Sequence, residues 1–134
     1  MLEKFLHFKT LASSQNQRDE RRMVEERGEL SQIVNGECFR HLVFIDIKKG
    51  FFRGKHYHIN HEETFYVISG TVKAVFEHTG TKERLIRIMK AGDKVTVLPE
   101  CAHVILALEY SQLVHFSRDE YDPADTYPYD FEGL

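Results

Sequence analysis

Two histidines lie two residues apart near the middle of the chain, and a carboxylate follows them. In an extended strand, residues i and i+2 point to the same face, so His56 and His58 are expected to project together. Glu63 lies five residues after His58, where the next predicted strand begins, and His103 lies in a second segment far downstream. Three imidazoles and a carboxylate suit a divalent transition metal. We therefore predict a metal site at these four residues; zinc is favoured, and Fe, Mn, Ni or Cu also fit.

These ligands need strands to position them, and the surrounding sequence is typical of strands. Segments rich in branched and aromatic residues recur at short spacing, with glycine-containing turns between them. Helical periodicity is almost absent, so the pattern favours an all-β sandwich or barrel. The predicted strands are 4–9, 30–34, 39–47, 55–58, 64–69, 71–78, 84–89, 94–98, 102–108 and 111–117.

The length of 134 residues and the mass of 15.7 kDa indicate one domain. We expect an N-terminal arm over about residues 1–30, a barrel over about 31–117 and a C-terminal tail over 118–134. Within the arm, the polar stretch 12–29 predicts a solvated loop or a short helical turn. The tail, with two prolines, predicts an irregular segment whose aromatic rings pack on the outside.

The charge composition bears on which kinds of partner the protein is expected to bind. With 18 basic and 21 acidic residues the formal charge is −3, which does not indicate a nucleic-acid or membrane-surface partner. No apolar run has the length of a signal peptide core or a membrane span, so a cytoplasmic location is expected. Cys38 and Cys101 are too few and too isolated for a disulfide framework, and we predict two buried free thiols.

The ligand run resembles the cupin superfamily. Residues 50–70 fit the first cupin motif, Gly-x5-His-x-His-x4-Glu-x6-Gly, at every position. In the second motif the metal-ligand position His103 is kept, whereas the proline is displaced by one, to Pro99, and the motif's Gly and Asn are replaced. Over about residues 40–117 the resemblance implies a double-stranded β-helix, the cupin jelly roll, with an interior wide enough for a small ligand.

A narrower resemblance is to the RmlC-like sugar-nucleotide epimerases and 3,4-ketoisomerases. The cupin domain at the C-terminus of capsular-polysaccharide sugar-nucleotide epimerase/reductases is more similar still: there, Arg-Gly-x-His-Tyr-His-x4-Glu precedes a late Phe/Tyr-Asp-Pro-x-x-Asp-Thr-Tyr. This chain carries the first form at 53–63 and the second at 121–127. The resemblance implies an isomerase or epimerase of a nucleotide-linked keto-deoxy sugar in surface-polysaccharide biosynthesis, with the metal polarising the ketone.

The resemblance also implies substrate-binding residues. Arg53 and Lys55 are the candidate partners of the substrate's diphosphate, through charge-assisted hydrogen bonds. Strict alternation would turn Arg53 to the face opposite His56, unless a bulge at Gly54 re-aims the chain.

The sequence does not single out a general base. The candidates are Tyr66, His115 and Tyr121, and each also has an ordinary structural interpretation. The remaining histidines have no ligand spacing of their own and are predicted to be surface or packing residues; they are His7, His41, His61 and His78.

Two other functions stay open at this point. The same set of three histidines and one glutamate serves iron-dependent cupin dioxygenases, and other cupins bind a sugar or another small ligand without turnover. Small cupins also resemble one another in forming dimers, often by exchange of an N-terminal strand. The alternating segment Phe5–Lys9 has the pattern for such an exchange, so we expect a homodimer.

Overall fold

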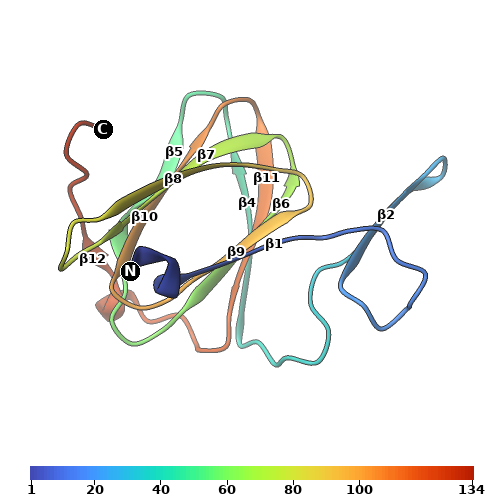
Figure 1. Ribbon diagram of the computed structural model, residues 1–134, viewed down its shortest axis with the longest axis horizontal. Helices are drawn as coiled ribbons and strands as arrows, with labels where there is room; N and C mark the ends of the chain where they lie inside the picture. The colour runs from blue at the N-terminus through green and yellow to red at the C-terminus, as the bar shows by residue number, and fades with distance from the viewer.

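The computed structural model describes all residues from Met1 to Leu134, and it is all-β, as predicted (Figure 1). The strands are β1 (Leu6–Thr10), β2 (Arg21–Glu25), β3 (Gly28–Gln32), β4 (His41–Ile47), β5 (Phe52–Tyr57), β6 (Glu63–Ser69), β7 (Thr71–His78), β8 (Arg84–Lys90), β9 (Asp93–Val97), β10 (Cys101–Ala107), β11 (Ser111–Ser117) and β12 (Tyr127–Pro128). The two helical segments, η1 (Leu2–Phe5) and η2 (Pro123–Asp125), are short 3₁₀ turns, so no helix of the structure could span a bilayer.

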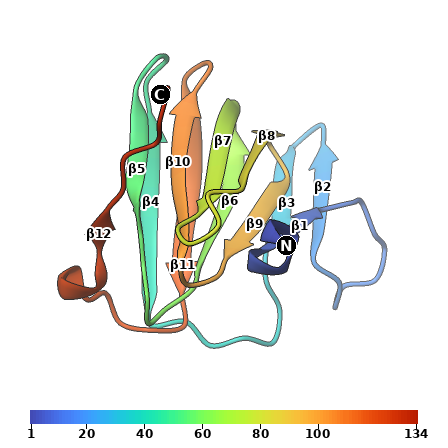
Figure 2. The same cartoon turned by 60° about the vertical axis from the view of Figure 1, so that its left-hand side comes forward.

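Two five-stranded antiparallel sheets face each other and enclose the main core (Figure 2). One sheet has the order β1-β9-β6-β11-β4 and the other has the order β12-β5-β10-β7-β8. Alternate residues of each strand point between the sheets. In β6, for example, Phe65 and Val67 belong to the main core, whereas Tyr66 between them packs with Leu11 and Phe116 in a separate cluster. Tyr66 therefore points away from the barrel interior.

The N-terminal arm contains a β-hairpin: its first strand, β2, lies where the sequence predicted a loop or a helical turn, and its second strand, β3, overlaps the predicted strand 30–34. Strands β2 and β3 pair only with each other and project from the barrel (Figure 1). Their sequence is polar because both faces of the hairpin are largely solvated; even Val24 and Leu30 are exposed. Such a strand lacks the alternating pattern that identifies a half-buried one. Strand β1 pairs with β9 of the same chain, and its exchange between two copies stays a prediction.

The C-terminal tail follows the outside of β5 and adds a short strand to the sheet (Figure 2). Tyr127 opposes Tyr57 in register, and the Tyr129 backbone N–H donates to the Lys55 carbonyl at 2.9 Å. The tail is irregular over most of its length, as predicted. However, Phe131 is buried rather than packed on the outside. The tail is thus attached directly to the strand that carries His56.

The two cysteines are free, as predicted, but only one is buried. Cys101 lies in the core, where burial raises the pKa of its thiol to about 12. Cys38 is exposed, contrary to the prediction, because it lies in the connection before β4 rather than on a strand.

Glu77 on β7 anchors the tail, and its ionisation should make the stability of the protein depend on pH. Its carboxylate accepts hydrogen bonds from the Tyr129 hydroxyl and from Arg84 Nε, the latter at 2.8 Å. Burial alone would raise the pKa of Glu77, but these hydrogen bonds outweigh it and hold the pKa below the ordinary value of 4.5. A carboxyl group with a lowered pKa stabilises the fold above its ordinary pKa, and this contribution is lost as the pH falls below that value.

We therefore expect Glu77→Gln to lower the free energy of unfolding at neutral pH by about 1–2 kcal/mol. Urea unfolding between about pH 6 and pH 3 should then show a shallower pH dependence in the variant than in the wild type. Glu132→Gln is the matched control, because it removes an exposed carboxylate from the same tail. Equal pH slopes for Glu77→Gln and the wild type would contradict this account.

Candidate functional site

The four predicted metal ligands converge at one point inside the barrel. His56 on β5 opposes His103 on β10, His58 follows the end of β5, and Glu63 begins β6. The four ligand atoms lie within 4.8 Å of one another. His58, Glu63 and His103 are buried, and His56 is half-buried. The structure thus brings together all four residues that the spacing selected.

A β-bulge in β5 sets the position of His56. Along the pair of strands, His56 opposes His103 and Gly54 opposes Val104, so Lys55 is the extra residue. The backbone φ angle is +114° at Gly54 and +64° at Lys55. This is the bulge at Gly54 on which the predicted role of Arg53 depended.

The bulge turns one of the two predicted phosphate partners toward the site and the other away. Arg53 and His56 line the same cavity, which strict alternation along β5 would prevent. The Lys55 side chain lies outside this lining, with its ammonium 4.5 Å from the centroid of the Phe52 ring. The structure therefore brings Arg53, but not Lys55, to the ligand set.

Backbone carbonyl groups orient two of the histidine ligands. His58 Nδ1 lies 2.7 Å from the Asp125 carbonyl oxygen, and His103 Nδ1 lies 3.2 Å from the Cys101 carbonyl oxygen. A carbonyl oxygen only accepts hydrogen bonds, so each Nδ1 must carry the proton and donate it. In the neutral ring the lone pair is then on Nε2, the atom that faces Glu63.

At the centre of the cluster, hydrogen-bond acceptors face each other. His58 Nε2 lies 2.7 Å from Glu63 Oε1, and His103 Nε2 lies 3.0 Å from Glu63 Oε2. Neither of these Nε2 atoms nor Glu63 Oε2 has a hydrogen-bond partner, although all three are buried. Buried acceptors without partners are costly unless a cation lies between their lone pairs. Together with His56, this donor set fits a divalent transition metal.

The electrostatics of the cluster favour the protonation states that a metal requires. Burial alone would raise the pKa of Glu63, but the hydrogen bonds that the four surrounding imidazoles donate to its carboxylate when they carry the proton on Nε2 outweigh burial and hold the pKa well below its ordinary value. Burial, reinforced by the neighbouring His103, lowers the pKa of His56 to about 4. At neutral pH the cluster therefore contains a carboxylate and a neutral His56, which are competent ligands.

A second histidine–carboxylate pair lies behind the ligands, and the sequence prediction missed it. His61, predicted as a surface or packing residue, is 9% exposed in its side chain. Its Nε2 lies 3.5 Å from Glu63 Oε1, and its Nδ1 lies 2.6 Å from Asp125 Oδ2. The contact with Glu63 raises the pKa of His61; burial opposes this rise and Asp125 adds to it. The available signals were the position of His61 inside the ligand run and that of Asp125 inside the late signature.

The ligand set lines a cavity of about 490 Å³, a volume suited to a small molecule. Part of the lining is apolar and comes from both sheets. Exposed polar groups, Arg53 and Tyr121, lie where the cavity meets solvent. The apolar lining residues are Val43, Ile45, Phe65 and Ile105.

Two of the three candidate bases line this cavity. His115 Nε2 lies 3.3 Å from Glu63 Oε1, and the Tyr121 ring stacks on His41 with the ring centroids 5.3 Å apart. His41, predicted as a surface or packing residue, thereby also lies at the site. Tyr66 does not reach the cavity, because it points to the opposite face of β6.

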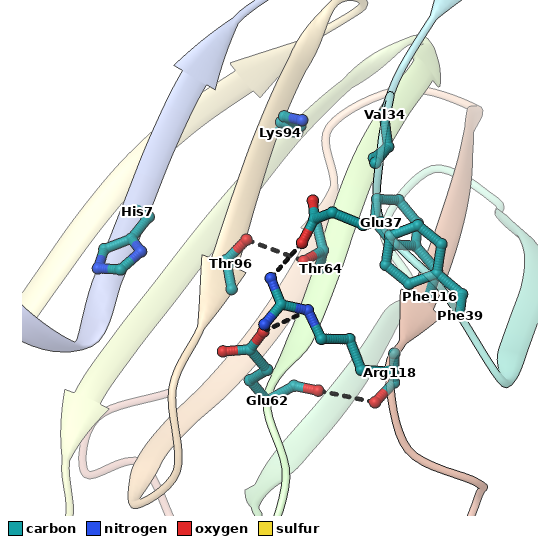
Figure 3. Close-up of a pocket in the computed structure, with 11 residues that line it drawn as sticks. His7, Val34, Glu37, Phe39, Glu62, Thr64, Lys94, Thr96, Phe116 and Arg118 are labelled. Atoms are coloured by element: carbon teal, nitrogen blue, oxygen red, sulfur yellow. Dashed lines mark hydrogen bonds and ion pairs between the residues drawn. The ribbon is translucent and has the colours of Figure 1, made fainter. Parts of the chain in front are cut away.

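A second hollow, of about 360 Å³, lies on the outer face of the β1–β9–β6–β11 sheet (Figure 3). The hydroxyls of Thr64 and Thr96 lie 2.8 Å apart there, and Arg118 forms ion pairs with Glu37 and Glu62 (Figure 3). None of the polar atoms that line this hollow is both buried and without a partner. The histidine cluster, which does contain such atoms, is therefore the better candidate site.

Comparison with known proteins supports the family and the fold that the sequence predicted. The family described as "Polysaccharide biosynthesis C-terminal domain" matches residues 23–127. No curated protein matches the chain. Among solved structures, the chain is similar to ChmJ, a 3'-monoepimerase from Streptomyces bikiniensis in complex with dTDP-quinovose. The TM-score is 0.77 at 16% identity, over 92% of this chain and 69% of ChmJ.

Two further solved structures are similar. The first is the 3,4-ketoisomerase QdtA from Thermoanaerobacterium thermosaccharolyticum in complex with TDP-4-keto-6-deoxyglucose, with a TM-score of 0.71 at 14% identity over 91% of this chain and 86% of QdtA. The second is the capsular polysaccharide assembling protein CapF from Staphylococcus aureus, with a TM-score of 0.62 at 23% identity over 82% of this chain. The matched region covers only 32% of CapF. These similarities confirm the predicted RmlC-like jelly roll.

Proposed function

Because the chain belongs to the polysaccharide biosynthesis C-terminal domain family, we propose that it is a metal-binding cupin that isomerises or epimerises a nucleotide-linked keto-deoxy sugar. The observation that carries this proposal is the convergence of His56, His58, Glu63 and His103 in a cavity of small-molecule size. The substrate class is supported by the similar folds of ChmJ and QdtA, which are known in complex with thymidine-diphosphate sugars.

The side chains around the cluster account for binding. Arg53 binds the diphosphate, because its planar guanidinium donates two parallel hydrogen bonds to phosphate oxygens. Val43, Ile45 and Ile105 form an apolar wall against the deoxy carbon of the sugar and exclude water from the reacting end. Together these groups direct the sugar toward the histidine cluster and the nucleotide toward solvent.

The chemistry takes place beside the ketone. His56, His58, Glu63 and His103 would hold a divalent cation, which would supply Lewis-acid polarisation of a carbonyl oxygen. The backbone carbonyls that hold His58 and His103 keep the Nε2 atoms of both rings aimed at one point. The proton on the carbon next to the ketone passes to a base within hydrogen-bond reach of the bound sugar. His115 and Tyr121 are the two candidate bases that line the cavity.

Exchange with heavy water tests this proposal. TDP-4-keto-6-deoxyglucose incubated with the protein in D₂O is expected to exchange the hydrogen next to its ketone, which proton NMR measures. His115→Gln and Tyr121→Phe are compared, and the variant of the true base should exchange more slowly than the wild type. Bound metal without exchange on nucleotide-linked keto sugars would overturn the enzymatic proposal and favour a binding cupin. Oxygen uptake by the iron-loaded protein would favour a dioxygenase instead.

A further inference from the structure

The late signature of the chain builds a turn with a buried carboxylate at its end. Asp122 caps η2 by accepting a hydrogen bond from the Ala124 backbone N–H at 3.0 Å, and Pro123 occupies the first position of the turn. Asp125 ends the turn and is only 3% exposed. A carboxylate this deeply buried must be fully hydrogen-bonded, so its partners indicate its role.

All partners of the Asp125 carbonyl and carboxylate groups lie in the segment that connects the two ligand-bearing strands β5 and β6. Its carbonyl oxygen accepts from His58 Nδ1 at 2.7 Å. Its carboxylate accepts from the backbone N–H groups of Ile59 and Asn60 at 2.9 and 3.0 Å. It also accepts from His61 Nδ1 at 2.6 Å. One residue of the tail therefore holds four consecutive residues beside the metal site.

From these contacts we infer that Asp125 is a positioning residue, which orients the imidazoles of His58 and His61 so that both Nε2 atoms face Glu63. The inference rests on the proposed metal-binding function. An acceptor on Nδ1 fixes the tautomer and the rotation of the ring, and it makes Nε2 a better electron donor. His58 Nε2 lies 2.7 Å from Glu63 Oε1, whereas His61 Nε2 lies 3.5 Å from it. His58 is thus held as a ligand, and His61 is held beside the Glu63 carboxylate.

The substitution Asp125→Asn separates the carboxylate's role from the turn's structure. The asparagine has nearly the same volume, and its carbonyl oxygen still accepts from the Ile59 and Asn60 backbone N–H groups. Its NH₂ group, in contrast, donates and cannot accept from His61 Nδ1–H. The His61 ring must then rotate or change tautomer, and the polar group that it presents to Glu63 changes with it.

Titration with Co²⁺ measures the consequence, because the visible spectrum of bound Co²⁺ reports ligand geometry. Asp125→Asn is expected to weaken Co²⁺ binding by about 10–100-fold and to shift the visible bands. Asp130→Asn is the matched control, since Asp130 is an exposed carboxylate in the same tail. It should bind Co²⁺ as the wild type does. Wild-type affinity and bands in Asp125→Asn would overturn the inference.

A second measurement needs neither metal nor variant. In nitrogen-15 NMR of the wild-type protein without metal, His58 and His61 are both expected to carry their ring proton on Nδ1, with slow exchange. Ring protons on Nε2 in both residues would overturn the positioning role. If the wild type takes up no Co²⁺ while these Nδ1 protons are present, the metal-binding proposal fails and the positioning role stands.

Discussion

The Glu63→Gln protein is expected to lose its bound metal and keep its fold. Glutamine has nearly the size of glutamate, so the packing of the buried side chain is preserved. Its neutral amide is a poor ligand and lacks the charge that offsets a divalent cation. Removal of an outer hydrogen-bond partner already costs about 10–100-fold in metal affinity, and removal of a ligand should cost more. Elemental analysis of protein purified without added metal should find about one metal ion per wild-type chain and background in the variant.

Glu62→Gln is the matched control for this prediction. Glu62 is the neighbouring carboxylate, but it lies at the outer hollow, 3.7 Å from Arg118 Nε (Figure 3). Its variant should retain the wild-type metal content. His58→Ala should lose metal like Glu63→Gln, because it removes a second ligand. Equal metal content in the wild type, Glu63→Gln and His58→Ala would show that these residues do not form a metal site.

The residues of the ligand set were predictable because their geometry depends on local rules. His56 and His58 share a face through the two-residue period of a strand, and Glu63 follows within the same run. The strands themselves were recognisable from branched residues and glycine turns, since their inner faces are buried. His103 could not be assigned from strand periodicity alone. Its segment pairs with β5 across the sheet, which the cupin spacing implied and the register confirms.

Residues whose position depends on distant packing were not predictable. His61 and Asp125 are 64 positions apart, and they meet only because the tail returns along β5. No period in the sequence encodes that return. Tyr66 was proposed as a base although its neighbour Phe65 faces the core, so alternation alone excludes it from the cavity. Strand β2 was missed for the opposite reason, because a strand exposed on both faces has no hydrophobic pattern.

The second large effect is expected from Gly54→Ala, at the bulge of β5. A Cβ atom at Gly54 would lie 2.6 Å from the His103 carbonyl oxygen and 3.0 Å from Val104 Cα, and the backbone φ is +114°. Both neighbours are backbone atoms of β10 and cannot rotate away, so the two strands must separate. The strained backbone and the overpacking together should lower the free energy of unfolding by about 3 kcal/mol or more. Metal binding should fall as well, because His56 and His103 are paired across this contact.

Gly50→Ala separates the two causes of that effect. Gly50 also has a positive φ, of +86°, but a Cβ atom there meets nothing within 4 Å. This control should lose only the backbone contribution, about 1–2 kcal/mol, and should bind metal like the wild type. Urea unfolding and metal analysis of both variants measure the difference. Gly54→Ala with the metal content of Gly50→Ala would mean that the close approach of β5 and β10 does not set the ligand geometry. A loss of metal confined to Gly54→Ala would attribute that geometry to the absence of a side chain at this one position.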